Sequence, residues 1–337
     1  TSLISVTIPE GVEIIENSAF YGCDNLKNIN IPNSITNIGS SAFTACTSIE
    51  RMKISKNVTN IEDNAIPDTI LIYTASNTEG HRYAEEAGQG YIIDDEGPTV
   101  NYTPNGSQKT EKGYEVKIDL KDNEDFIGMN EDSFKYQWTQ SINQPTKESF
   151  TQSFENGQTI TKNTGDGEWY LWVYAKDNLE NESITRSEAY YFDNTAPIVN
   201  VEYSTKQMTE ENVIVTIRAN EEIQPINGWT LSNDKQSLTK EYTENTTEMI
   251  TIKDLAGNEA QANIEIANIG NMIIGDINQD GKIDVTDFLM LKRHMVAGSR
   301  ESWKLTGNSL LVADMNENGT VDITDMLMLK KIIVEDM

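Results

Sequence analysis

An acidic loop of 12 residues occurs twice near the C-terminal end of this 337-residue chain. The first copy, "DINQDGKIDVTD", begins at Asp276, and the second, "DMNENGTVDITD", begins at Asp314. Both copies place oxygen-bearing side chains at positions 1, 3, 5, 9 and 12, with glycine at position 6. This spacing surrounds a hard cation with oxygen and needs a sharp turn at the glycine. Two copies in register therefore predict two calcium loops.

The spacing is that of an EF-hand loop, in which position 7 offers its backbone carbonyl oxygen. Lys282 and Thr320 occupy that position, so the charge of the lysine side chain is no obstacle. The sequence predicts two bound Ca²⁺ ions with a structural role. The expected ligands are Asp276, Asn278, Asp280, Lys282, Asp284 and Asp287 in the first loop, and Asp314, Asn316, Asn318, Thr320, Asp322 and Asp325 in the second.

A helix is predicted after each loop, in "VTDFLMLKRHMV" and "ITDMLMLKKIIV". Each helix has one apolar face, formed by Phe288, Leu291 and Met295 in the first copy and by Met326, Leu329 and Ile333 in the second. No helix is predicted before either loop, where "NIGNMIIG" and "NSLLVA" stand, although the link around Trp303 is expected to hold a short helix. Each copy is thus half of an EF-hand. A calcium sensor needs two helices per loop, so a sensor is not expected.

The duplicated loop and helix, closing on Asp rather than Glu, resemble the type I dockerin module of cellulosomal proteins from Gly275 to about Val334. The resemblance implies a small all-α calcium-binding fold and a cohesin module of a scaffoldin as partner. It implies contacts at loop positions 10 and 11 and at a basic pair in the helix. These positions are Val285, Thr286, Lys292 and Arg293, and then Ile323, Thr324, Lys330 and Lys331. The alternative for Lys292 and Lys330 is a solvated helix face.

The N-terminal region repeats every 23 residues, so that Leu3, Leu26 and Ile49 coincide. Such a period is typical of a solenoid, with one strand expected per repeat in "VTIP", "INIP" and "MKIS". The repeats resemble the leucine-rich repeats of bacterial surface antigens, which implies a surface for a protein or cell-surface ligand. The alternative is the last part of a longer array. A cap with a helix near residues 81–87 is expected to follow.

Cys23 and Cys46 occupy the same position in adjacent repeats. They are expected as two buried thiols, with a disulfide between repeats as the alternative.

Two strand-rich modules fill the middle of the chain and resemble the Ig-like modules of secreted Gram-positive proteins. In "GEWYLWVYAKDN", one face holds Trp169, Leu171, Val173 and Ala175 and suits a sandwich core. The other face holds Tyr170, Trp172 and Tyr174, which are expected to pack across strands, with a sugar-stacking platform as the alternative. The "DLAGN" segment at 254–258 is expected to be a hairpin turn rather than a calcium site.

The fold class is therefore multidomain: a β-rich leucine-rich-repeat solenoid at 1–96, two all-β Ig-like sandwiches at 97–195 and 196–270, and a dockerin at 271–337. The formal net charge of −28 argues against nucleic acid and anionic membrane as partners, and no apolar run is long enough to span a membrane. The resemblances imply a secreted, extracellular protein that is associated with a cellulosome or cell surface. Because the sequence starts inside a repeat, it is expected to be part of a longer precursor.

No catalytic constellation is recognised, since His81 and His294 are the only histidines. The chain itself is thus not expected to be an enzyme. The alternative is the C-terminal part of a carbohydrate-active enzyme, such as a glycoside hydrolase, whose catalytic module lies upstream.

Overall fold

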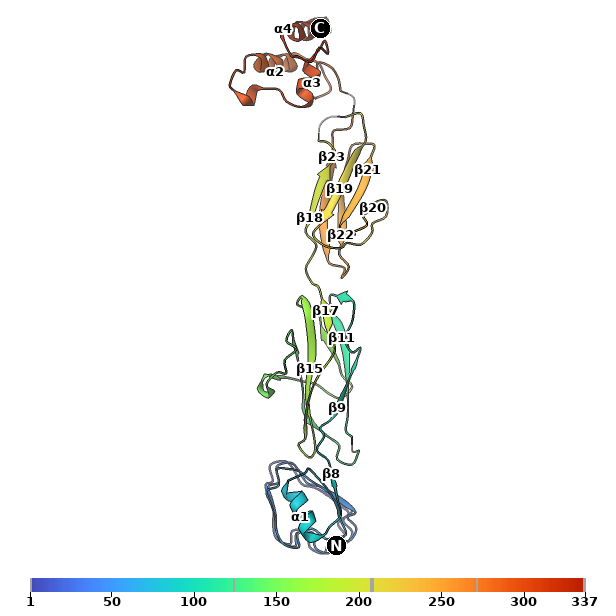
Figure 1. The fold of residues 1–337 in the computed structure, drawn as a ribbon, viewed down its shortest axis with the longest axis vertical. Coiled ribbons are helices and arrows are strands. Elements are labelled where there is room, and N and C mark those ends of the chain that lie inside the picture. Colours follow the sequence, from blue (N-terminus) through green and yellow to red (C-terminus); the bar gives the residue numbers. More distant parts are fainter. Residues whose placement is uncertain (1, 124, 207–208, 271, 336–337) are drawn as a thin grey trace. The chain divides into compact units, whose positions relative to one another are not determined.

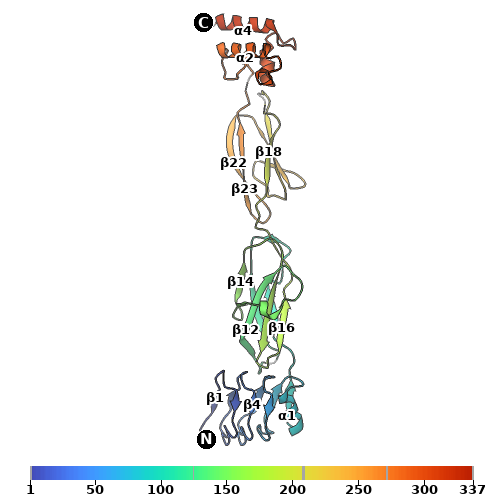
Figure 2. The ribbon, with the colours of Figure 1, turned by 90° about the vertical axis from the view of Figure 1, so that its left-hand side faces the viewer.

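A computed structural model describes residues 2–123, 125–206, 209–270 and 272–335. The chain divides into two compact units, Thr1–Asn194 and Thr195–Met337, drawn in two views in Figures 1 and 2. The finer division into four modules, with boundaries after residues 96, 195 and 270, stays a prediction.

The repeat region of the first unit is built from short parallel strands. Its strands are β1 (Ser5–Thr7), β2 (Ile14–Ile15), β3 (Asn28–Asn30), β4 (Asn37–Ile38), β5 (Arg51–Ile54), β6 (Asn60–Ile61), β7 (Leu71–Thr74) and β8 (Tyr91–Ile93). β1 pairs with β3, and β2, β4 and β6 form a second ladder that joins Ile14, Asn37 and Asn60. These partners stand one 23-residue repeat apart. The expectation of one strand per repeat was wrong, because each repeat turns after its first strand and forms a second, two-residue strand.

The coinciding apolar positions of the repeats form one core. Leu26, Ile49 and Ile54 are buried, and the rings of Phe20 and Phe43 stack with centroids 5.3 Å apart. Cys23 and Cys46 are buried free thiols, and the Cys46 Sγ donates to the carbonyl oxygen of Phe20 at 3.1 Å. The pairing of successive repeats thus stacks residues at equivalent repeat positions.

Helix α1 (Glu79–Ala87) closes the repeat region, two residues earlier than the predicted start. The Thr78 side chain caps its N-terminus, and Gly88 ends it in the left-handed conformation with φ 67°. The Tyr83 hydroxyl is fixed by hydrogen bonds with the backbone of Ile66, so the helix seals the last repeat.

The rest of the first unit consists of two sheets around an apolar core. The elements are β9 (Thr99–Thr103), β10 (Thr110–Glu111), β11 (Tyr114–Lys121), β12 (Met129–Thr139), η1 (Lys147–Ser149), β13 (Gln152–Ser153), β14 (Thr159–Lys162), β15 (Gly167–Asp177), β16 (Glu182–Arg186) and β17 (Tyr190–Phe192). One sheet has the order β14-β11-β9, and the other has the order β10-β17-β15-β12-β13 with β16 beside β15.

Strand β15 confirms the predicted core face and the packing that was expected of the opposite face. Leu171, Val173 and Ala175 are fully buried between the sheets. Tyr170, Trp172 and Tyr174 are less than 10% exposed, because the segment that carries Phe150 packs over them. The structure thus agrees with packing and contradicts an open sugar platform at these three rings.

The repeat region and the following sheets touch directly within the first unit. Tyr73 of β7 packs with Ile127 and Leu179, which come from two loops of the sheets. The Lys53 Nζ donates to the Ile127 carbonyl oxygen at 3.1 Å, and the Asn181 Nδ2 donates to the Asp94 carbonyl oxygen at 2.8 Å. The face of β5, β7 and β8 is therefore covered in part by the chain itself.

The second unit begins with a smaller pair of sheets. Its strands are β18 (Val199–Tyr203), β19 (Val213–Ala219), β20 (Thr230–Leu231), β21 (Ser237–Tyr242), β22 (Thr246–Lys253) and β23 (Glu259–Ile266). The order β18-β19-β21-β20 forms one sheet and the β22-β23 hairpin the other, around a core that includes Val215, Leu238 and Ile264.

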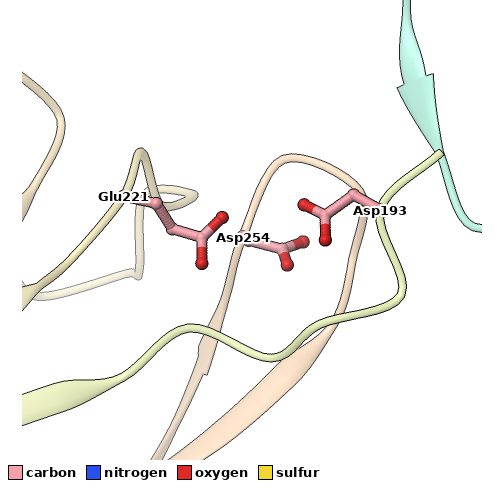
Figure 3. A group of neighbouring side chains, drawn as sticks. All are labelled: Asp193, Glu221 and Asp254. Carbon is pink, nitrogen blue, oxygen red and sulfur yellow. The ribbon is translucent and has the colours of Figure 1, made fainter. Parts of the chain in front are cut away.

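The predicted turn at 254–258 joins β22 to β23. Asp254 is fully buried and accepts hydrogen bonds from the backbone and the side chain of Asn258, both at 2.8 Å. Gly257 has φ 86°, as the tight turn requires. Figure 3 shows the Asp254 side chain together with that of Glu221, which lies on another loop of the same unit.

The C-terminal part of the second unit is helical. It contains α2 (Val285–Met295), η2 (Glu301–Trp303), α3 (Asn308–Ala313) and α4 (Ile323–Glu335), with α2 packed against α4 (Figure 2). The expectation of no helix before either loop was wrong for the second loop, since "NSLLVA" forms α3, which ends at Ala313, directly before Asp314. Among the described residues, no helix has the length and apolar character to cross a membrane.

Candidate calcium loops and docking face

The first loop is held by its own acidic side chains. The Asp276 carboxylate accepts the backbone N–H groups of Asp280 at 3.1 Å and Gly281 at 2.8 Å. The Asp287 carboxylate accepts those of Asn278 and Asp284, both at 2.9 Å. Positions 1 and 12 thus tie the start, the turn and the end of the loop together.

The second loop repeats these hydrogen bonds position by position. The Asp314 carboxylate accepts the N–H groups of Asn318 at 3.1 Å and Gly319 at 2.7 Å. The Asp325 carboxylate accepts those of Asn316 at 3.2 Å and Asp322 at 2.8 Å. The two loops therefore share one backbone frame.

Both loops need a left-handed backbone at the same two positions. Gly281 and Gly319 have φ of 84° and 85°, and Gln279 and Glu317, two residues earlier, have φ of 60° and 56°. Glycine at position 6 removes the steric cost of this conformation. The sharp turn expected from the spacing is present in both copies.

Position 12 also lies in the first turn of the following helix. Asp284 caps the N-terminus of α2, and Asp287 completes a capping box by accepting the Asp284 N–H. Hydrogen bonds from Thr286 lower the pKa of the Asp284 carboxyl, and those from Thr324 lower the pKa of Asp322. Each loop is therefore continuous with its helix.

The predicted ligands gather in each loop, but their carboxylates face the loop amides. Among the described residues of these loops, no three carboxylates bring an oxygen each within 4.8 Å of one another. The side-chain oxygens of Asn278 and Asn316 likewise accept N–H groups inside their loops, from Asp280 and Asn318. The structure thus brings the expected donors to one loop without clustering them around a single point.

The donor set nevertheless fits a hard cation. Asp287 and Asp325 are fully buried, and Asp276 is 5% exposed. The ion pairs of this helical region join Lys304 to Glu301 and Lys331 to Glu335, and no described cationic side chain pairs with the buried carboxylates. Buried carboxylates are costly unless a cation compensates their charge. Oxygen donors of this kind suit calcium.

The predicted partner-binding residues all lie on the exposed sides of α2 and α4. Leu291 and Leu329 are fully buried between the helices, as expected. Val285 is 59% exposed and Ile323 is 53% exposed. The remaining six predicted residues are exposed as well, namely Thr286, Lys292, Arg293, Thr324, Lys330 and Lys331.

Sequence reasoning missed four apolar side chains on these exposed sides. Leu289 and Val296 of the α2 copy are 49% and 62% exposed, and their counterparts Leu327 and Val334 are 57% and 58% exposed. Leu289 and Val296 follow Val285 at the same sequence intervals at which Leu327 and Val334 follow Ile323. This repetition could have revealed them from the sequence. On α4 the groove lined by Leu327, Lys330, Lys331, Val334 and Glu335 has a volume of about 280 Å³.

His294, one of the two histidines, has a structural part in this region. Its Nδ1 accepts the N–H of Leu305 at 2.8 Å and fixes the link between the two halves. The other histidine, His81, packs its ring against Tyr91 in the first unit.

Comparison with known proteins assigns both ends of the chain. Residues 274–334 match the type I dockerin domain, and residues 1–82 match the BspA type leucine rich repeat region in six copies. The C-terminal helical region is therefore a type I dockerin domain. Domains of this type bind calcium, and a cohesin is the partner that they imply. Dockerin-bearing proteins are typically extracellular components of cellulosomes.

Among solved structures, the chain is similar to the fibronectin(III)-like modules of Clostridium thermocellum CbhA, with 10% identity and a TM-score of 0.25, over 50% of this chain and 94% of that chain. It is also similar to the amphioxus IgVJ-C2 molecule, with 16% identity and a TM-score of 0.23, over 47% of this chain and 99% of that chain. At these TM-scores the likenesses carry no conclusion about function. No curated protein matches the chain.

Proposed function

We propose that this chain is a secreted, non-catalytic, multimodular protein that docks through its dockerin domain onto a cohesin of a cellulosome-type scaffoldin. The observation that carries the proposal is the duplication of one hydrogen-bonded loop together with one exposed apolar and basic helix side. Each exposed side is built at the same loop and helix positions. The type I dockerin match supports the same partner.

Calcium has a structural role in this proposal. Two ions would be held, one by the oxygens of Asp276, Asn278, Asp280, Lys282, Asp284 and Asp287, and one by those of Asp314, Asn316, Asn318, Thr320, Asp322 and Asp325. A bound ion neutralises the buried carboxylates and stabilises the folded loop, because binding free energy adds to folding free energy. The chain's own part is to hold the loop frame through positions 1 and 12.

The docking face combines apolar and basic groups on each helix. Val285 and Thr286, or Ile323 and Thr324, are small enough to let a partner surface approach the helix start. Lys292 and Arg293, or Lys330 and Lys331, can then donate to acceptors on that surface. The added apolar residues Leu289 and Leu327 enlarge the area that a partner would bury. Either helix could in principle face the cohesin.

The remaining modules act as an interaction arm in this proposal. The repeats form a short solenoid that presents a protein or cell-surface ligand site, and the two Ig-like sandwiches act as spacers. The covered face of β7 limits that ligand site to strands nearer the N-terminus, such as β1 and β3. Module boundaries after residues 96, 195 and 270 belong to the same proposal.

Binding of the purified full chain to a panel of cohesins tests the docking proposal. We expect at least one type I cohesin to bind in the presence of calcium. An unrelated Ig-like module serves as the negative control and should not bind. A panel that includes type I cohesins from the same source and shows no binding would contradict the proposal. Hydrolysis of polysaccharides by the same preparation would contradict its non-catalytic part.

A further inference from the structure

A groove of about 310 Å³ lies in the first unit, between two sheet edges. β13 is the edge strand of one sheet and β14 is the edge strand of the other, and the chain crosses between them at residues 154–158. Residues of β12, the segment after β14 and the start of β15 complete the groove. It is separate from the dockerin domain and plays no part in the docking proposed above.

The lining of this groove differs from the rest of the chain in charge. The chain has 54 acidic residues among 337, yet no carboxylate of the described residues lines the groove. Among these described lining residues the only charged group is Lys162, and the other side chains are aromatic, amide or hydroxyl groups. The lining residues are Tyr136, Gln137, Trp138, Ser149, Thr151, Gln152, Thr161, Lys162, Asn163, Thr164 and Trp169.

The aromatic ring of Trp169 is held in one orientation. The Lys162 Nζ lies 3.8 Å from its ring centroid, and the Trp169 Nε1 donates to the Asp166 carbonyl oxygen at 3.0 Å. Gly165 has φ 92°, and a Cβ there would stand 2.9 Å from the ring, so the glycine makes room for it. Trp138 is fixed by edge contacts with Tyr190 and Phe192. A prearranged aromatic wall reduces the entropy cost of binding a ligand.

The polar groups of the groove can both donate and accept hydrogen bonds. Gln152, Asn163 and Thr164 are exposed, and the Gln137 Nε2 donates to the Ser149 hydroxyl at 2.9 Å. Amide and hydroxyl side chains match the mixed donor and acceptor character of sugar hydroxyls. The apolar C–H face of a sugar ring packs well against an aromatic side chain, which provides area without charge.

From these features we propose that the groove between β13 and β14 binds an uncharged oligosaccharide. The sugar ring would pack against Tyr136 and against the part of the Trp169 ring that Lys162 leaves uncovered. Its hydroxyls would bond to the amides of Gln152 and Asn163. An uncharged ligand is favoured because the single cation, Lys162, is already placed over the Trp169 ring, and because no carboxylate is present to bind a cationic ligand.

Native affinity electrophoresis of the full chain tests the proposal, with xylan, galactomannan and hydroxyethylcellulose as neutral probes and polygalacturonate as an acidic one. We expect retardation by at least one neutral polysaccharide, weakened at least about tenfold by Trp169→Ala. The double variant Gln152→Ala with Asn163→Ala changes two exposed side chains and is expected to weaken retardation as well. If Trp169→Ala disturbs folding, the double variant alone tests whether the groove binds the polysaccharide.

The matched controls are Trp303→Ala in the dockerin domain and Gln261→Ala on β23, which should leave retardation unchanged. Retardation by no neutral polysaccharide would overturn the proposal. So would retardation that the double variant leaves intact, or stronger binding to polygalacturonate than to every neutral probe.

Discussion

The two loop–helix halves of the dockerin domain share a backbone frame but differ in charge. Positions 1 and 12 make the same hydrogen bonds in both loops. Position 5 is Asp280 in the first loop and Asn318 in the second, and position 7 is Lys282 in the first and Thr320 in the second. The loop backbone therefore depends on the carboxylates at positions 1 and 12 and on the glycine at position 6. The charge of the other ligand positions can differ between the loops without changing that backbone.

The helices of the two halves differ much less. Val285 and Ile323 are similarly exposed, and so are Leu289 and Leu327. The basic pair is Lys–Arg in α2 and Lys–Lys in α4. The loop backbone and the exposed side of the following helix are thus both duplicated. Two alternative docking faces require both features in each half.

The largest expected effect is that of calcium removal on both halves at once. Excess EDTA should unfold the dockerin domain and abolish cohesin binding, because the buried carboxylates Asp287 and Asp325 lose their compensating charge. Circular dichroism and a pull-down on the same sample would measure both effects. Cohesin binding that persists in excess EDTA would contradict the structural role of calcium.

The next effect tests whether the two docking faces are equivalent. Leu289→Asp or Leu327→Asp alone should change cohesin affinity by less than about threefold, since the other face remains. The double variant should lose at least about 100-fold, or about 2.7 kcal/mol. Calorimetry with an identified cohesin measures this. A single variant that alone abolishes binding would show that one face is used exclusively.

A smaller effect concerns the charge difference between the loops. Asp280→Asn should reduce the calcium affinity of the first loop by about tenfold, because affinity depends on the number of charged ligands. The reciprocal change Asn318→Asp should strengthen the second loop. Calcium titration followed by NMR resolves the two loops. Equal affinities before and after the exchange would disprove the dependence on position 5.

The smallest effect lies at the helix caps. Thr286→Val should raise the pKa of Asp284, and Thr324→Val that of Asp322, since each threonine donates to the ionised carboxyl. A lowered pKa favours the folded form above the ordinary aspartate range, and this contribution is lost as pH falls through the folded pKa. NMR titration of the folded, calcium-loaded chain and of each variant measures both values. Unchanged values would show that the threonines do not set them.

The loops and the repeats could be predicted because their information is local. Fixed spacing placed Asp276, Gly281 and Asp287, and the 23-residue period placed Leu26 and Ile49 in one core. The packing of Tyr170 and Trp172 was expected, but the segment that covers them could not be predicted, because Phe150 belongs to a loop about twenty residues away in sequence. Alternation reveals two faces of a strand but not what a distant loop places over one of them.

Short elements were missed for a different reason. Helix α3 has only six residues, and "NSLLVA" is too short to show a helical period. The second strand of each repeat has two residues, and its ladder depends on pairing with the next repeat. The exposed Leu289 and Leu327 could have been found, because the alignment of the two halves already places them at equal positions.

Counting the calcium ions tests the account most directly. Calcium would be titrated calorimetrically into the metal-free full chain, and again into Asp287→Ala and Asp325→Ala variants. The account predicts two ions for the natural sequence and one for each variant, with the loss confined to the altered loop. Binding of no ion, or of one ion that neither variant removes, would contradict it.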